Sequence, residues 1–188
     1  VQRGIYEVCS VSGLHPALAL DGEHRAQLEK TPVNYHSPEE YDKDPGTYLE
    51  HMKAMKQSGV HVHSMTPEEA YHAKRGTDRT YAQTYEALAK AGLDSVPGTA
   101  AEILVDEVRE VICPNKISTD EWMEAMRGAA EVGLPMTSTI MYGHVDNARH
   151  RVMHLKKIRD LQDETGNITE FVPLKFIYEE TPLFKRDL

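Results

Sequence analysis

Two histidines stand one residue apart in a short apolar run of this sequence, residues 60–65. Side chains alternate along a β-strand, so a strand here would place His61 and His63 on the same face. With His15 and His144 they could form a divalent-metal site that activates water, as in barrel hydrolases. No spacing fixes a third ligand, so the alternative is that the two imidazoles hydrogen-bond a substrate.

A second candidate is Glu102, which follows the small residues 98–101 (GTAA) after another apolar run. Small side chains let a ligand approach the backbone, and the amide groups of a following helix would attract an anion. The alternative is an acidic residue in the first turn of that helix, where the helix dipole stabilises it. Cys9 and Cys113 lie far apart in the sequence, and Cys113 precedes a proline, so both are expected to be structural cysteines.

These candidates lie on or near short runs that predict strands, because the runs are rich in β-branched and apolar residues. The five predicted strands cover residues 5–11, 60–65, 93–97, 135–141 and 169–176. Helical periodicity between them predicts right-handed βαβ units with single helices and a parallel sheet, which is an α/β fold. The dinucleotide fingerprint G-x-G-x-x-G and the phosphate loop G-x-x-x-x-G-K-S/T are absent from the sequence, which favours a barrel over a doubly wound sheet. In a barrel, the reacting groups project from the carboxyl ends of the strands.

Capping residues predict where the helices begin and end. Ser118 and Glu121 have the spacing of a capping box, and Gly133 predicts the end of the helix that they begin. Asp146 is predicted to cap a long helix that ends at residues 165–167. One face of that helix is basic, and we interpret it as a solvated helix surface.

The 188 residues suit one domain, with residues 21–45 as a polar inserted loop that carries one short helix. Lys and Arg number 21 against 30 Asp and Glu, and the net charge of −9 argues against a nucleic-acid partner. No stretch approaches the ~20 apolar residues of a membrane helix, so no membrane partner is expected. Two cysteines and the lack of a signal peptide predict a cytoplasmic protein. Because Val1 leads directly into a patterned segment, we expect the chain to be a piece of a longer protein.

Six strings occur in the order typical of one radical S-adenosylmethionine (SAM) family. They are residues 12–16 (SGLHP), 61–67 (HVHSMTP), 97–104 (PGTAAEIL), 141–146 (MYGHVD), 161–166 (LQDETG) and 170–174 (EFVPL). The sequence thereby resembles the tyrosine-using subunit of FO synthase, the 5-amino-6-(D-ribitylamino)uracil–L-tyrosine 4-hydroxyphenyl transferase family of coenzyme F420 biosynthesis. The radical enzymes of the futalosine route to menaquinone share some of these strings and are the alternative.

The resemblance implies a partial (β/α)6 barrel and two cofactors, a 4Fe–4S cluster and SAM. The family holds the cluster with a C-x-x-x-C-x-x-C loop after its first strand, and this sequence contains no such loop. The resemblance therefore implies a fragment that lacks the first βα unit and begins with the second strand of the barrel. The segment 21–45 is longer than the family pattern.

The resemblance also implies a reaction. A radical derived from SAM would remove hydrogen from L-tyrosine, the amino acid would break between Cα and Cβ, and the 4-hydroxybenzyl group would add to 5-amino-6-(D-ribitylamino)uracil. The second FO synthase subunit would act on the product. Strand position within the family then suggests three roles for residues of this chain, and it assigns none to metal binding. The roles are catalysis for His144 and Glu102, cofactor binding for Gly13, Thr139 and Tyr142, and substrate binding for His15, His61, His63, Asp146 and Glu170.

Overall fold

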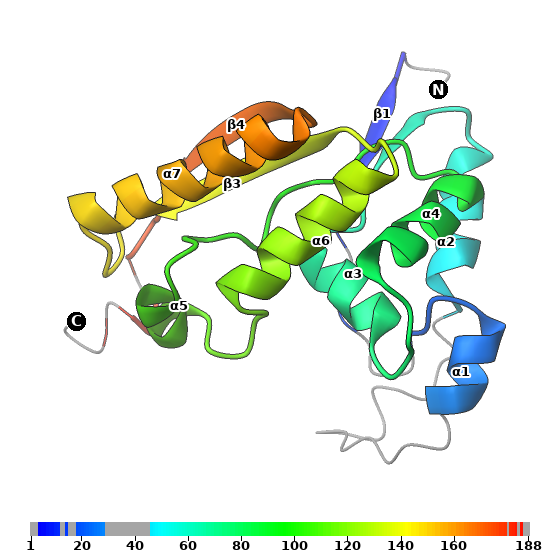
Figure 1. Cartoon of the computed structure of the whole chain (residues 1–188), viewed down its shortest axis with the longest axis horizontal. Helices are drawn as coiled ribbons and strands as arrows, with labels where there is room; N and C mark the ends of the chain where they lie inside the picture. Colours follow the sequence, from blue (N-terminus) through cyan, green and yellow to red (C-terminus); the bar gives the residue numbers. More distant parts are fainter. Residues whose placement is uncertain are drawn as a thin grey trace.

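The computed structural model describes residues 4–11, 14, 18–28, 46–179, 181–183 and 185, and these form the predicted α/β arrangement (Figure 1). In chain order the elements are β1 (Glu7–Cys9), α1 (Gly22–Leu28), α2 (Tyr48–Lys56), β2 (His61–His63), α3 (Pro67–Lys74), α4 (Tyr81–Ala91), α5 (Asp106–Ile112), α6 (Thr119–Glu131), β3 (Met136–Tyr142), α7 (Ala148–Thr165) and β4 (Ile168–Lys175). No helix in the described ranges is long and apolar enough to cross a membrane.

The strands are parallel, as the alternation of elements predicts. β1 pairs with β2, and β3 pairs with β4. Two isolated parallel bridges, His63 with Ser95 and Val96 with Met136, connect these pairs. The third predicted strand, residues 93–97, is therefore present only as two bridging residues that lie between β2 and β3.

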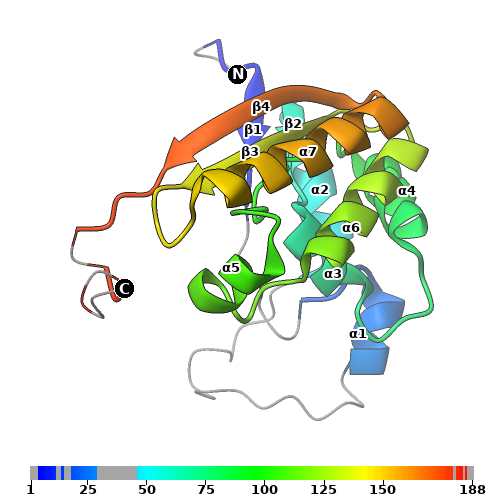
Figure 2. The same cartoon turned by 60° about the vertical axis from the view of Figure 1, so that its left-hand side comes forward.

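Helices cover one face of these strands (Figures 1 and 2). Val62, Val96 and Met136 point to that side, where they are fully buried in the main hydrophobic cluster with residues of α4 and α6. Trp122 of α6 is the largest fully buried side chain among the described residues. Burying this apolar face of the sheet leaves the opposite face to carry the polar side chains of the same strands.

Local capping determines the helix ends largely as predicted. The capping box of Ser118 and Glu121 begins α6, and Gly133 follows the helix with a φ of 78°. The expected cap at Asp146 is wrong, because Asn147 is the N-cap of α7. Asp146 instead accepts hydrogen bonds from the backbone N–H groups of the two residues that follow Tyr142.

The prediction of single helices between strands is also wrong. Two helices, α3 and α4, follow β2, and two more, α5 and α6, precede β3. α3 has its own capping box, formed by Thr66 and Glu69, which begins a helix at Pro67. The short helix expected in the insert is present as α1, whereas residues 29–45 of the same insert lie outside the described residues.

Candidate active site

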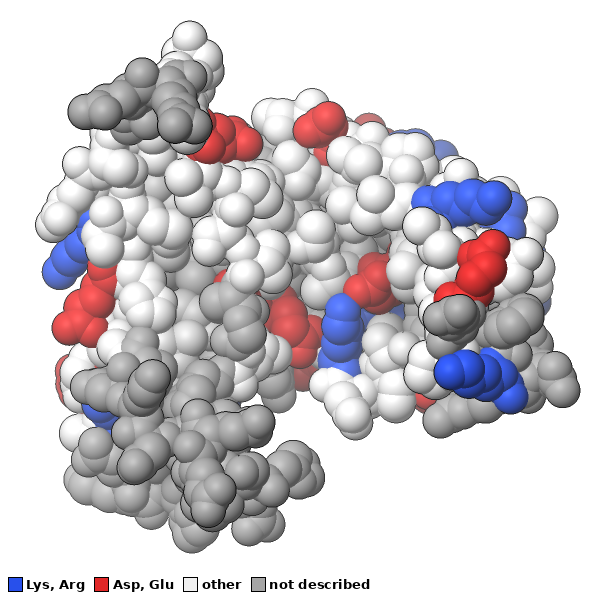
Figure 3. All heavy atoms as spheres, turned by 180° about the vertical axis from the view of Figure 1, so that it is seen from behind, with Lys and Arg blue, Asp and Glu red and all other residues white. Residues whose placement is uncertain are grey.

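The sheet face opposite the helices is the open face, and strand alternation determines which residues lie on it. Parallel pairing places Glu7 beside His61, and Thr137 beside Glu170. This face is hollowed, and both acidic and basic side chains are visible within the hollow (Figure 3). By register and alternation it comprises Glu7, Cys9, His61, His63, Ser95, Thr137, Thr139, Met141, Glu170, Val172 and Leu174.

Three predicted substrate-binding residues, His61, His63 and Glu170, lie on this face. The Ser95 hydroxyl oxygen lies 2.7 Å from Nε2 of His61 and 2.7 Å from Nδ1 of His63. A carboxylate oxygen of Glu7 lies 3.9 Å from the same His61 nitrogen. Burial lowers the pKa of His63, although the charges of Glu7 and Glu170 oppose that shift. Sequence patterns did not single out Ser95, because its place depends on the pairing of two distant segments.

The two predicted cofactor-binding residues that the structure describes, Thr139 and Tyr142, lie on opposite faces of β3. The Thr139 hydroxyl donates to the carbonyl oxygen of Gly98 at 3.2 Å, and its side chain is almost fully buried. Tyr142 packs against the smaller core cluster, with the guanidinium carbon of Arg151 5.4 Å from its ring centroid. The structure therefore does not bring the two side chains together. Gly13 and His15 lie outside the described residues.

Glu102 lies in a tightly held loop between the third strand segment and α5. Its φ is 46° and that of Ala100 is 62°, so both adopt the left-handed backbone conformation that favours glycine. The carboxylate forms an ion pair with Lys116 at 2.6 Å. Because α5 begins only at Asp106, the alternative of Glu102 as a first-turn helix residue is wrong.

Three buried side chains hold the backbone of this loop. Arg109 donates to the carbonyl oxygens of residues 100 and 101, and also to that of residue 117. Trp122 donates from Nε1 to the carbonyl oxygen of residue 99 at 3.1 Å. Nδ1 of His154 accepts from the backbone N–H of residue 104 at 3.0 Å. The position of Glu102 is thus determined by helices α5, α6 and α7.

His144 and Asp146 form a turn after β3, and both side chains are fully buried. Nε2 of His144 bonds to the carbonyl oxygen of Met141 at 3.0 Å, and its ring packs edge-on against Phe176. Burial alone would raise the pKa of Asp146, but hydrogen bonds from Arg151 and from two backbone N–H groups hold it below its usual value. These contacts join the turn to neighbouring residues on β3, on α7 and after β4.

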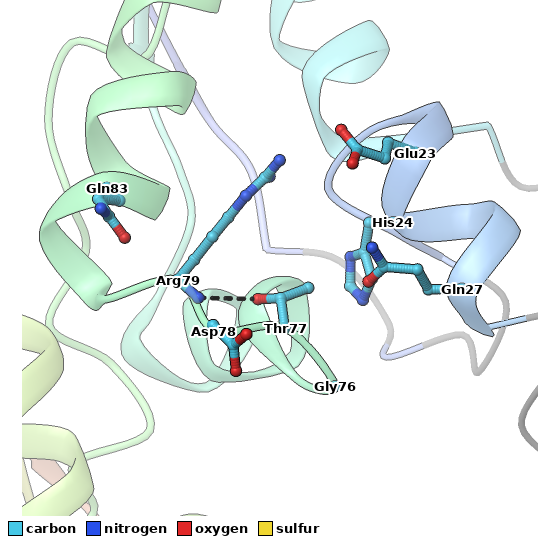
Figure 4. Close-up of a pocket in the computed structure, with 8 residues that line it drawn as sticks. All are labelled: Glu23, His24, Gln27, Gly76, Thr77, Asp78, Arg79 and Gln83. Atoms are coloured by element: carbon cyan, nitrogen blue, oxygen red, sulfur yellow. Dashed lines mark hydrogen bonds between the residues drawn. The ribbon is translucent and has the colours of Figure 1, made fainter.

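A separate polar pocket of about 360 Å³ lies between α1 and the turn that joins α3 to α4 (Figure 4). Both nitrogens of His24 are used there, Nδ1 by the backbone N–H of Leu20 and Nε2 by the carbonyl oxygen of Arg75. Arg79 forms an ion pair with Asp21 at 2.8 Å. These contacts join α1 to the turn, and they lie apart from the open face. The lining residues are Glu23, His24, Gln27, Gly76, Thr77, Asp78, Arg79 and Gln83.

No group of three or more His, Cys, Asp or Glu side chains within the described residues is arranged to hold a metal ion. The sequence has two cysteines, of which Cys9 is exposed and Cys113 is partly buried. Burial raises the pKa of each thiol, which disfavours the thiolate form that binds iron. The residues present do not fit a 4Fe–4S cluster, because these two thiols cannot supply three thiolate ligands.

Comparison with known proteins agrees with this arrangement of parallel strands and helices. The family model of the radical SAM superfamily matches residues 1–158. The chain belongs to this superfamily. The radical SAM membership implied by the sequence is thus confirmed, and it accounts for the α/β fold.

Several curated relatives share the name 5-amino-6-(D-ribitylamino)uracil–L-tyrosine 4-hydroxyphenyl transferase. The relative from Haloarcula marismortui is 67% identical over 191 residues, which cover 100% of this chain and 42% of the relative. The relative from Halobacterium salinarum is 62% identical over 99% of this chain and 42% of its own length. That from Methanospirillum hungatei is 41% identical over 99% of this chain and 44% of its own length. The chain therefore spans less than half the length of these relatives.

Proposed function

We propose that this chain is part of a radical SAM transferase that joins the 4-hydroxybenzyl group of L-tyrosine to 5-amino-6-(D-ribitylamino)uracil. The observation that carries the proposal is the 67% identity to a transferase of that name along the whole chain. In the proposed protein the chain forms most of one domain, a (β/α)6 barrel, and the open face lines the interior of that barrel. The parallel order of the strands supports that architecture.

The proposed reaction requires a closed cavity in which two substrates are held and a radical is protected from water. A cluster-bound SAM supplies that radical when it is present, and its thiolate ligands are not among the residues of this chain. The chain itself offers the polar side chains of the open face. His61 and His63 can each donate or accept a hydrogen bond, and the Glu170 carboxylate can accept one. Their partners would be the amine and phenol of tyrosine and the ribityl hydroxyls.

The remaining assignments belong to the same proposal. Gly13 and Thr139 would bind SAM, and Asp146 would bind a substrate. Tyr142 lies on the face of β3 that packs against the helices, so we leave it out of the cofactor site. A second FO synthase subunit would use the product, and the whole system would operate in the cytoplasm. Glu102 and His144 would act in catalysis, although both already make structural contacts.

The full-length product of the gene tests the proposed activity. It is purified without oxygen, its cluster is reconstituted, and it is incubated with SAM, L-tyrosine and the aminouracil. We expect formation of 5′-deoxyadenosine and of an adduct whose mass includes the 4-hydroxybenzyl group, each dependent on tyrosine. Turnover of a futalosine-route substrate in place of tyrosine would contradict the proposal. Residues 1–188 alone should bind no cluster after the same treatment, as measured by visible absorbance and iron content.

Substitutions test the catalytic assignments separately. In the full-length enzyme, Glu102→Ala and His144→Ala should each lower turnover at least about tenfold, or about 1.4 kcal/mol of transition-state stabilisation. Lys116→Ala is the matched control, because it breaks the same ion pair and keeps the Glu102 carboxylate. Equal losses in Glu102→Ala and Lys116→Ala would mean that the ion pair matters and that the carboxylate has no catalytic role.

A further inference from the structure

The Ser95 hydroxyl lies between two imidazole rings on the open face. Its oxygen is 2.7 Å from Nε2 of His61 and 2.7 Å from Nδ1 of His63. Ser95 is 7% exposed, so water has little access to this hydroxyl. Parallel bridging of His63 with Ser95 holds the three side chains on one face. The contact therefore follows from strand register and does not depend on a flexible loop.

A serine hydroxyl carries a single proton, so it can donate to only one of two neutral imidazoles. The other imidazole must then donate to the serine oxygen. If His61 donates from Nε2, His63 accepts at Nδ1 and carries its own proton on Nε2. In the reverse arrangement both rings carry their protons on Nδ1. The geometry thus requires that two neutral rings always have the same tautomer.

We propose that Ser95 couples His61 and His63 into a proton relay across the open face. A proton taken up at Nδ1 of His61 is matched by release of the Nε2 proton to the Ser95 oxygen. The Ser95 proton moves to Nδ1 of His63, and His63 gives up its Nε2 proton to an acceptor in the cavity. One proton enters and one leaves, and no electron is transferred.

The surrounding charges suit a transient positive charge on the relay. The carboxylates of Glu7 on β1 and Glu170 on β4 lie on the same face as the two rings. The carboxylate of Asp94, next to Ser95, interacts electrostatically with His61 and is paired with Lys56. Burial and the charge on Glu7 raise the pKa of the Cys9 thiol, which keeps this neighbouring group neutral. Burial also disfavours the charged form of His63, so a proton that arrives there is readily passed on.

The use of this relay rests on the proposed function. In the transferase, the acceptor or donor at Nε2 of His63 would be a protonatable amine or phenol of a bound substrate. Ser95 is then a positioning residue, because it acts through the two histidines and touches no reacting atom. The shared tautomer, in contrast, is a property of this chain alone and can be measured without substrate.

Long-range ¹H–¹⁵N NMR spectra of the histidine-labelled 188-residue chain test the coupling between pH 5 and pH 9, a range that brackets the ordinary pKa of about 6.5 for histidine. His61→Gln and His63→Gln assign the two rings. We expect one tautomer in both neutral rings, and we expect protonation of one ring to lower the apparent pKa of the other. Ser95→Ala should remove both effects, whereas Ser95→Thr, which keeps a hydroxyl, should retain them. Ser58→Ala is the control, because it removes an exposed hydroxyl that donates to the carbonyl oxygen of Met55.

Opposite tautomers in the two neutral rings, or identical titrations in the native chain and Ser95→Ala, would overturn the relay. In the full-length enzyme, Ser95→Ala should lower kcat at least about tenfold with little change in KM, and Ser95→Thr should restore it. Unchanged kcat in an active Ser95→Ala enzyme would also overturn the relay. If the full-length enzyme lacks transferase activity, the proposed function fails, and the NMR result still decides whether the rings are coupled.

Discussion

Among the described glycines, Gly98 is the one where the structure leaves least room for a side chain. A Cβ atom added there would lie 2.0 Å from the carbonyl oxygen of Thr137 and 2.8 Å from Cα of Ser138. Both obstacles are backbone atoms of β3, so they cannot rotate away as a flexible side chain could. Gly98→Ala therefore has to push the 98–104 loop away from the sheet.

The cost of that movement can be worked from the contacts it breaks. Overpacking of a buried site costs about 1–3 kcal/mol. The shift also lengthens two 3.2 Å hydrogen bonds, from the Gly98 N–H to the Thr137 hydroxyl and from the Thr139 hydroxyl to the Gly98 carbonyl oxygen. Each contributes about 1 kcal/mol. We expect Gly98→Ala to lower the free energy of unfolding by roughly 3–5 kcal/mol.

Urea denaturation followed by circular dichroism measures this effect. With an m-value of about 2–3 kcal/mol/M, the unfolding midpoint should fall by roughly 1–2.5 M. Gly22→Ala is the matched control, because its added Cβ has no neighbour within 4 Å. If the two variants unfold within about 0.5 kcal/mol of each other, the close approach of the loop to β3 does not exist and the reasoning fails.

Three further predictions concern the core. Gly128→Ala places a Cβ 2.5 Å from Cβ of Tyr81, between α4 and α6. It should lower the free energy of unfolding by about 1–2 kcal/mol, although alanine has the better helix propensity. An unchanged urea midpoint would contradict the close contact between the two helices. Arg109→Met leaves three backbone carbonyls without their donor and should cost about 3 kcal/mol or more in urea denaturation, whereas Arg127→Met at an exposed ion pair should change the midpoint little. Burial lowers the pKa of His154 to about 4, so its neutral form contributes stability fully above pH 6.5 that is lost as the pH falls towards 4. The loss of stability is about 3 kcal/mol. His154→Gln should therefore flatten the pH dependence of thermal unfolding over that range. An equally steep dependence in the variant would refute the role of His154.

Local signals predicted local structure well. Ser118 with Glu121 and the glycine at position 133 lie where the capping rules place them, because a cap involves only neighbouring residues. The missed helix α3 has a physical reason. It buries mostly small or polar residues, such as Ala70 and His72, so it lacks the apolar stripe by which helices are recognised.

The same difference between local signals and contacts of distant segments applies to the candidate site. Strand alternation predicted a shared face for His61 and His63, and the same alternation places Thr139 and Tyr142 on opposite faces of β3. Ser95 could not be found in this way, because its contact requires the register between two segments that are distant in the sequence. Sequence patterns of one segment contain no information on register with another.

The capping boxes of α3, α4, α6 and α7 also have a consequence for the order in which the chain folds. Helices with such caps form from neighbouring residues within microseconds, whereas parallel strands must first close long loops. Until those loops close, the apolar sides of Val62 and Val96 are open to other chains. Helices that form early give each strand an apolar surface to dock on, so the caps shorten the interval in which newly made chains can aggregate.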